Sequence, residues 1–112
     1  TITVGPTDVL TTAHNRLRNA GFSQLPVMNE GELDGVVTED AIIQFVYGKP
    51  ELMTAPVQDA MESAFIKLDR TASLNNLVAM LRVQPYAAIM DGDEFVGLIT
   101  RSDVLNYLRR QM

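Results

Sequence analysis

The chain has 112 residues, of which 46% are hydrophobic, and this is enough for one compact domain with its own core. Its formal net charge of -5 argues against a nucleic-acid partner, because affinity for phosphate backbones comes mainly from lysine and arginine. The chain has no cysteine and no apolar run near the roughly 18 residues that cross a bilayer, so we expect no disulfide, no thiolate metal site and no membrane span.

A cysteine-free chain fits a reducing compartment, and we therefore expect a cytoplasmic protein. The first six residues lack the basic start and apolar centre of a signal peptide. The chain starts at Thr1 without a methionine, which suggests a piece of a longer protein.

The first half of the sequence predicts a helix, two strands and a second helix. Apolar residues within 10–17 recur at helical spacing, and Gly21 follows them, where a helix commonly ends in the left-handed conformation. The apolar stretches 25–28 and 35–38 flank a polar turn and predict a β-hairpin. Residues 42–46 have the apolar spacing of an amphipathic helix.

The second half repeats this order. Gly35-Val36-Val37-Thr38 recurs as Gly97-Leu98-Ile99-Thr100, a shift of 62 residues from Thr38 to Thr100. The second copy also has a short lead-in strand over 65–68, whereas the first copy begins too late to show one. We expect one module over residues 1–112, with an N-terminally truncated repeat over 1–50 and a second repeat over 54–112.

A half of about 50 residues is too small to bury a good core alone. The sequence therefore predicts an α+β fold in which two α-β-β-α repeats pack through their sheets with pseudo-twofold symmetry. The groove between the repeats is the expected ligand site.

The run Thr100-Arg101-Ser102-Asp103 stands where a strand turns into a helix. Its structural interpretation is a capping box, in which Thr100 and Asp103 satisfy the free amides of the helix start. Its functional interpretation is that the Asp103 carboxylate accepts hydrogen bonds from both hydroxyls of a ribose. The first copy has Ala41 at the matching position, three residues after Thr38, so the two grooves should differ.

Three other features carry less chemistry. Phe22 suits either plain core packing or stacking on a purine ring. His14 has no second histidine, serine or cysteine beside it and is interpreted as a surface residue. Asp91-Gly92-Asp93 is explained by a hairpin turn, so we predict neither a calcium site nor any other metal site.

These residues resemble a known family, the tandem CBS-domain (Bateman) modules. The resemblance rests on the hairpin from Pro26-Val27 to Gly35-Val36-Val37-Thr38 and on the pair Thr100 and Asp103, and it covers essentially the whole chain. Within this family the chain is most similar to the C-terminal regulatory modules of cystathionine β-synthases, through residues 21–27, 48–49 and 103–107.

The resemblance implies an adenosyl ligand, with S-adenosylmethionine favoured and AMP or ATP as alternatives. One groove would use Phe22, Ser23, Gln24 and Leu25 of the first copy with Thr100, Ser102 and Asp103 of the second. A second, weaker groove would use Thr38, Gln84 and Tyr86. Ser23 departs from the acidic residue that the resemblance leads us to expect there, which weakens the grip on the amino group of S-adenosylmethionine.

The resemblance also implies a regulatory domain rather than an enzyme. Ligand binding would shift the population of conformations and thereby control an attached catalytic domain, which would carry the pyridoxal phosphate (PLP) of the parent enzyme. Expected partners are the adenosyl small molecule, that catalytic domain and a second copy of the module in a homodimer. The alternative is a module that only dimerises, independently of any ligand.

Overall fold

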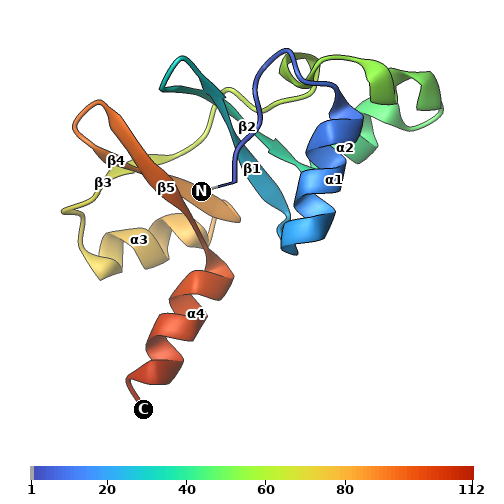
Figure 1. The fold of residues 1–112 in the computed structure, drawn as a ribbon. Helices are drawn as coiled ribbons and strands as arrows, with labels where there is room; N and C mark the ends of the chain where they lie inside the picture. Colours follow the sequence, from blue (N-terminus) through green and yellow to red (C-terminus); the bar gives the residue numbers. More distant parts are fainter. Residues whose placement is uncertain (1) are drawn as a thin grey trace. The chain divides into compact units, whose positions relative to one another are not determined.

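The structure is a computed structural model that describes residues 2–112 (Figure 1). It divides into two compact units, one ending at Ala64 and the other spanning Phe65–Met112. Each unit contains a helix, two antiparallel strands and a second helix, so the predicted α+β fold and the internal repeat are confirmed. No helix in residues 2–112 is long and apolar enough to cross a membrane.

The first unit contains α1 (Leu10–Ala20), β1 (Gln24–Asn29), β2 (Glu32–Thr38) and α2 (Glu39–Val46). Helix α1 ends at Gly21, whose φ of 70° is left-handed, as the sequence predicts. Strands β1 and β2 are antiparallel and pair from Gln24 opposite Thr38 to Asn29 opposite Glu32, with a shift of register between Val27 and Met28.

The first unit also has a lead-in strand residue, which corrects the expectation that this copy begins too late to show one. Val4 forms a parallel bridge with Val27, and its main chain exchanges hydrogen bonds with Pro26 and Met28. The sequence does not predict this strand residue, because the paired stretch is a single bridge that Gly5 and Pro6 follow directly. Such a stretch is too short to show an alternating pattern.

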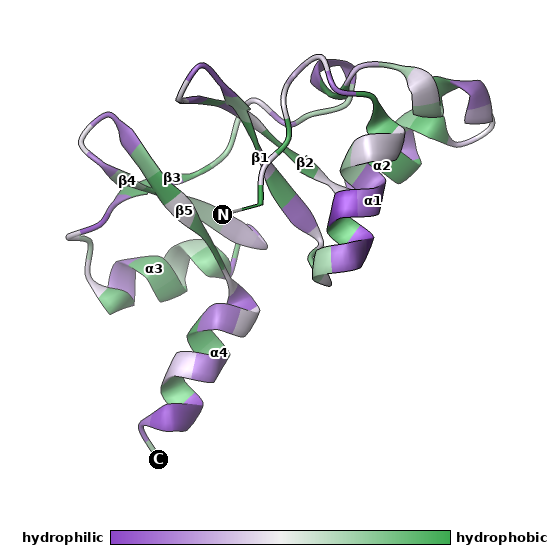
Figure 2. Cartoon of the chain, in the orientation of Figure 1, coloured by the Kyte–Doolittle hydropathy of each residue, from purple (hydrophilic) through white to green (hydrophobic). Residues whose placement is uncertain are grey.

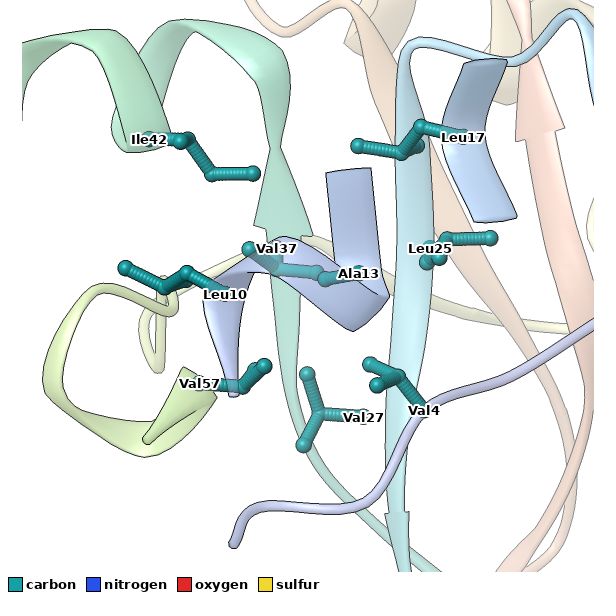
Figure 3. Packing of buried hydrophobic residues seen from close by; sticks show 9 residues of the cluster. All are labelled: Val4, Leu10, Ala13, Leu17, Leu25, Val27, Val37, Ile42 and Val57. Atoms are coloured by element: carbon teal, nitrogen blue, oxygen red, sulfur yellow. The ribbon is translucent and has the colours of Figure 1, made fainter. Parts of the chain in front are cut away.

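After α2 the chain folds back over the first unit through two 3-10 helices, η1 (Pro50–Thr54) and η2 (Val57–Asp59). The N–H of Leu10 donates to the carbonyl of Ala55 at 3.0 Å. The segment adds Val57 to the core, which Figure 3 shows between the two helices and the hairpin. The buried residues of this core are Val4, Leu10, Ala13, Leu17, Leu25, Val27, Val37, Ile42 and Val57.

The same segment explains why residue 35 is a glycine. Glu62 forms an antiparallel bridge with Val36, with hydrogen bonds in both directions of 2.7 and 2.9 Å. A Cβ on Gly35 would lie 2.7 Å from the carbonyl oxygen of Glu62 and 2.8 Å from the sulfur of Met61. The bridge can therefore form only where the strand has no side chain.

The second unit contains β3 (Lys67–Asp69), α3 (Leu74–Leu81), β4 (Tyr86–Asp91), β5 (Glu94–Thr100) and α4 (Arg101–Arg110). Strand β3 lies parallel to β4, and β4 lies antiparallel to β5. Tyr86 is opposite Thr100, which repeats the pairing of Gln24 with Thr38 in the first unit.

Candidate ligand-binding site

In the first unit, the start of β1 and the end of β2 meet at the beginning of α2. The hydroxyl oxygen of Thr38 accepts a hydrogen bond of 3.0 Å from the N–H of Ala41, so Thr38 is the N-cap of this helix. The N–H of Glu39 donates to the carbonyl of Ser23 at 3.0 Å. Main-chain bonds therefore hold Ser23 and Thr38 together at the start of α2.

In the second unit the equivalent place is a complete capping box, as the sequence predicts. One carboxylate oxygen of Asp103 accepts from the N–H of Thr100 at 2.8 Å and from its hydroxyl at 3.0 Å. The hydroxyl oxygen of Thr100 accepts in turn from the N–H of Asp103 at 3.3 Å. These bonds fix the carboxylate on the first turn of α4, where the amides of a helix start favour negative charge.

The Asp103 carboxylate remains open to solvent although it takes part in the capping box. Asp103 and Ser102 are exposed, and within residues 2–112 the second carboxylate oxygen of Asp103 has no hydrogen-bond partner. Such an oriented anion can accept hydroxyl groups from a ligand while its other oxygen keeps the helix capped. The structural and the functional interpretation of this motif are therefore compatible.

Arg101 fixes the start of α4, a role that the sequence does not predict. Its Nε donates a hydrogen bond of 2.6 Å to the carbonyl of Leu81, the last residue of α3. This bond positions the turn that carries Asp103. No signal in the sequence could have found it, because the two residues lie on different helices and are joined only by the fold.

The four residues predicted from the first repeat differ in exposure. Phe22 has 48% of its surface exposed, so it is not a core residue. Ser23 is exposed and Gln24 is half-buried. Leu25 is fully buried in the core, and its main chain pairs with Val37. The Leu25 side chain therefore offers no exposed surface to a ligand, and a ligand contact at this position stays a prediction.

The residues predicted for the weaker groove also differ. The Tyr86 side chain is 2% exposed, so it offers little surface to a ligand, and its place in the weaker groove stays a prediction. Gln84 is half-buried, and its N–H donates to the carbonyl of Met80 at 3.0 Å. Thr38 is 9% exposed, with its hydroxyl used by the helix cap.

Within each unit the structure brings these residues together at one end of the hairpin. Ser23 and Gln24 meet Thr38 in the first unit, and Tyr86 meets Thr100 in the second. The grouping predicted from the sequence is different and joins residues of the two repeats. That grouping stays a prediction.

A surface hollow of about 340 Å³ lies elsewhere on the second unit. It is lined by Lys67, Leu68, Asp69, Met90, Gly92 and Asp93, at the end of β4 opposite to Thr100. A hydrogen bond from the hydroxyl of Thr71 and further N–H donors lower the pKa of Asp69 below its ordinary value of 3.8. These bonds bind the carboxylate into its own turn, so we place the candidate site at Thr100 and Asp103.

Among residues 2–112 no three histidine, aspartate or glutamate side chains are grouped so that they could hold a metal ion. The candidate site therefore consists of one oriented carboxylate, hydroxyl groups and helix-start amides. This set of groups suits a polyhydroxylated or phosphorylated organic ligand.

A family model described as CBS domain matches residues 1–48 and, a second time, residues 57–110. The chain belongs to the CBS domain family. Two CBS domains in tandem correspond to the two repeats seen in the structure.

Two curated relatives are both named cystathionine beta-synthase. The one from Dictyostelium discoideum is 26% identical over 115 residues, which are 97% of this CBS pair and 23% of the relative. The one from Apis mellifera is 26% identical over 103 residues, or 88% of this chain and 20% of the relative. The CBS pair thus spans less than a quarter of each relative's length.

Solved structures share the fold of the CBS pair. A CBS domain-containing protein of unknown function from Bacillus anthracis has a TM-score of 0.87 at 21% identity, over 99% of this chain and 86% of that one. A hypothetical conserved protein from Geobacillus kaustophilus has a TM-score of 0.86 at 25% identity, over 99% and 89%. A Methanocaldococcus jannaschii protein described as a candidate archaeal homolog of g-AMPK has a TM-score of 0.85 at 24% identity, over 99% and 47%.

Proposed function

We propose that this CBS pair is a regulatory module that binds an adenosyl metabolite, with S-adenosylmethionine as the favoured ligand. The observation that carries the proposal is the Asp103 carboxylate, held by Thr100 through one oxygen and open to solvent through the other. A vicinal diol such as the 2′- and 3′-hydroxyls of ribose can donate to this carboxylate, and the first turn of α4 favours a nearby anionic group.

The curated relatives support the resemblance to cystathionine β-synthases, and this resemblance is what favours S-adenosylmethionine within the adenosyl class. Both are named cystathionine beta-synthase, and both are matched over a part of CBS-pair size. We infer that the module belongs to an enzyme of that kind and regulates it without catalysing a reaction itself. Pyridoxal phosphate would be bound by the catalytic domain of that enzyme.

Phe22, Ser23 and Gln24 would complete the ligand contacts. Phe22 is 48% exposed and thus offers an aromatic face to the adenine, on which a purine ring can stack. Ser23 offers a hydroxyl, which holds a ligand ammonium group less strongly than a carboxylate does. The proposed binding of S-adenosylmethionine therefore relies on the nucleoside half of the ligand.

Ser23 also favours a second candidate, an AMP- or ATP-sensing pair, because these ligands have no ammonium group to bind. One of the solved structures with this fold is described as a candidate homolog of g-AMPK. In either case the ligand regulates by shifting the equilibrium between two states of the module. The free energy of this shift cannot exceed the difference between the ligand's binding free energies to the two states.

Isothermal titration calorimetry with S-adenosylmethionine, AMP and ATP tests the proposal. The Asp103→Asn variant keeps an oxygen that can cap the helix but loses the charge, and we expect it to weaken binding at least about tenfold. Ser73→Ala is the matched control, because it removes the N-cap of α3, where the Ser73 hydroxyl accepts from Asn76 at 3.1 Å, away from the site.

Absence of heat with all three ligands, or equal affinity in Asp103→Asn and the natural chain, would contradict a sensing role. A dimer by sedimentation that no ligand changes would then favour the assembly module. The strongest heat with AMP or ATP would select the second candidate.

A further inference from the structure

Ser73 stands in a sequence pattern that no other hydroxyl residue of the chain has. Arg70 lies three residues before it, and the apolar Leu74 follows it directly. None of the other serines and threonines has a lysine or arginine two or three residues before it. A basic residue at the third position before a serine is a charge pattern by which many protein kinases select their substrates.

The structure leaves this run open on the surface. Residues 70–73 form the loop between β3 and α3, and all four are exposed. The Arg70 side chain has 62% of its surface exposed. Leu74 is 42% exposed, although the equivalent Leu10 of the first unit is fully buried. Surface loops are the places where a partner protein gains access to a side chain, so a kinase can reach Ser73 in the folded chain.

Two hydroxyl groups lie in this loop, and they differ in how their protons are used. The Thr71 hydroxyl donates to the carboxylate of Asp69 at 2.5 Å, and the Thr71 N–H donates to the same oxygen at 3.0 Å. The Ser73 oxygen accepts from the N–H of Asn76 at 3.1 Å, but within residues 2–112 the Ser73 O–H donates to no acceptor. Ser73 can therefore lose its proton without losing a donated hydrogen bond, whereas Thr71 cannot.

Helix α3 suits a phosphate at its start. Ser73 is the N-cap of this helix, where the amides of the first turn favour negative charge. The helix contains no charged residue, and Figure 2 shows it as hydrophobic over most of its length, so none of its side chains repels a phosphate. The N-cap of the equivalent helix α1 is Val9, which has no hydroxyl. The feature therefore belongs to the second unit alone.

Arg70 combines a fixed main chain with a mobile charge. Its N–H donates to the carbonyl of Met90 at 2.7 Å, which ties the start of the loop to β4. Its Nε lies 3.7 Å from a carboxylate oxygen of Asp91, and both side chains of this ion pair are more than half exposed. Such an exposed pair contributes little free energy. The guanidinium can therefore leave it for an acidic group in the substrate cleft of a kinase.

We propose that Ser73 is a phosphorylation site for a serine kinase that selects arginine three residues before the acceptor. The Ser73 oxygen attacks the γ-phosphorus of ATP, the bond from this phosphorus to the β,γ-bridging oxygen breaks, and ADP leaves. The hydroxyl proton passes to a carboxylate base of the kinase. The phosphate, with a charge of about −1.5 to −2, then strengthens the start of α3. The inference does not rest on the adenosyl ligand, because the proposed ligand contacts do not include Ser73.

The test incubates the natural chain with Mg-ATP and calcium/calmodulin-dependent protein kinase II, an arginine-directed probe. Mass spectrometry should find one phosphoryl group and place it on Ser73. Ser73→Asn keeps an oxygen that can cap α3 but removes the acceptor, so we expect no incorporation. Arg70→Gln should lower the initial rate at least about tenfold, because the selecting charge is lost. Lys67→Gln is the matched control, since it removes an exposed positive charge outside the pattern.

A second measurement tests the effect of the phosphate on the helix. The phosphorylated chain should melt about 1–5 °C above the unmodified chain, because the phosphate interacts with the amides at the start of α3. Phosphorus NMR should give the phosphate a lower second pKa than in a phosphopeptide of residues 67–78, because the same amides favour the dianion.

Absence of phosphate on the natural chain would overturn the proposal. Incorporation that persists in Ser73→Asn would place the acceptor elsewhere and would also overturn it. An equal rate for Arg70→Gln and the natural chain would remove the selecting role of the arginine. A lower melting temperature after phosphorylation would contradict the stabilised helix start.

Discussion

The Nε of Arg101 lies 2.6 Å from the carbonyl oxygen of Leu81 and joins the first residue of α4 to the last residue of α3. The bond is partly buried. It satisfies a carbonyl at the end of α3 that lacks a helical partner, and it fixes the turn on which Asp103 stands. This single contact therefore affects both the stability of the second unit and the geometry of the candidate site.

Replacing Arg101 by alanine should lower the free energy of unfolding by about 1–2 kcal/mol, because a charged hydrogen bond is lost and the Leu81 carbonyl loses its partner. Urea unfolding followed by circular dichroism measures this loss. Arg109→Ala is the control, because Arg109 is exposed at the other end of α4. Equal stability of the two variants would show that the Arg101 bond contributes nothing.

Gly35→Ala should be strongly destabilising, whereas Gly97→Ala should not. The two glycines are equivalent in the repeat, but a Cβ at Gly35 would lie 2.7 Å from the Glu62 carbonyl, while one at Gly97 meets nothing within 4 Å. We expect Gly35→Ala to cost about 1–3 kcal/mol, as overpacking against main chain does. Thermal unfolding of both variants checks the difference, and a similar melting temperature for the two would contradict the role given to the bridge at Val36.

Ala41→Asp should build in the first unit the capping box that the second already has. Thr38 already accepts from the N–H of residue 41, so a carboxylate there can bond back to the N-cap. We expect a gain of about 0.5–1 kcal/mol in the free energy of unfolding. Calorimetry with the ligand identified for the natural chain should show a second equivalent bound. Unchanged stability and stoichiometry would argue against the carboxylate as the deciding group.

Asp69 makes the stability of the second unit depend on pH in a defined direction. Hydrogen bonds from Thr71, first of all from its hydroxyl, lower the pKa of this carboxyl below 3.8 in the folded chain. Its contribution is therefore fully present above the unfolded pKa and is lost as the pH falls through the lower folded value. Unfolding curves of the natural chain and of Asp69→Asn should differ at pH 6 and converge in strong acid. A difference that stays constant with pH would mean that the charge of Asp69 plays no part.

Local patterns predicted most of the elements correctly. The end of α1 at Gly21 follows from a conformation that glycine adopts readily, and the capping box of α4 follows from side chains three residues apart. Whether a given side chain is buried or exposed was harder to predict. Phe22 could be core or surface by its type alone, and the burial of Tyr86 does not follow from its type either.

The amino-acid sequence by itself determined the internal repeat, the order of helices and strands, and the carboxylate at Asp103, because each can be recognised from short runs of neighbouring residues. Tertiary structure alone decided that Arg101 bonds to Leu81, that Glu62 lies against Gly35, and that Leu10 is covered while Leu74 is open. These relationships join distant parts of the chain, and no local pattern encodes which of two similar helices receives a covering segment.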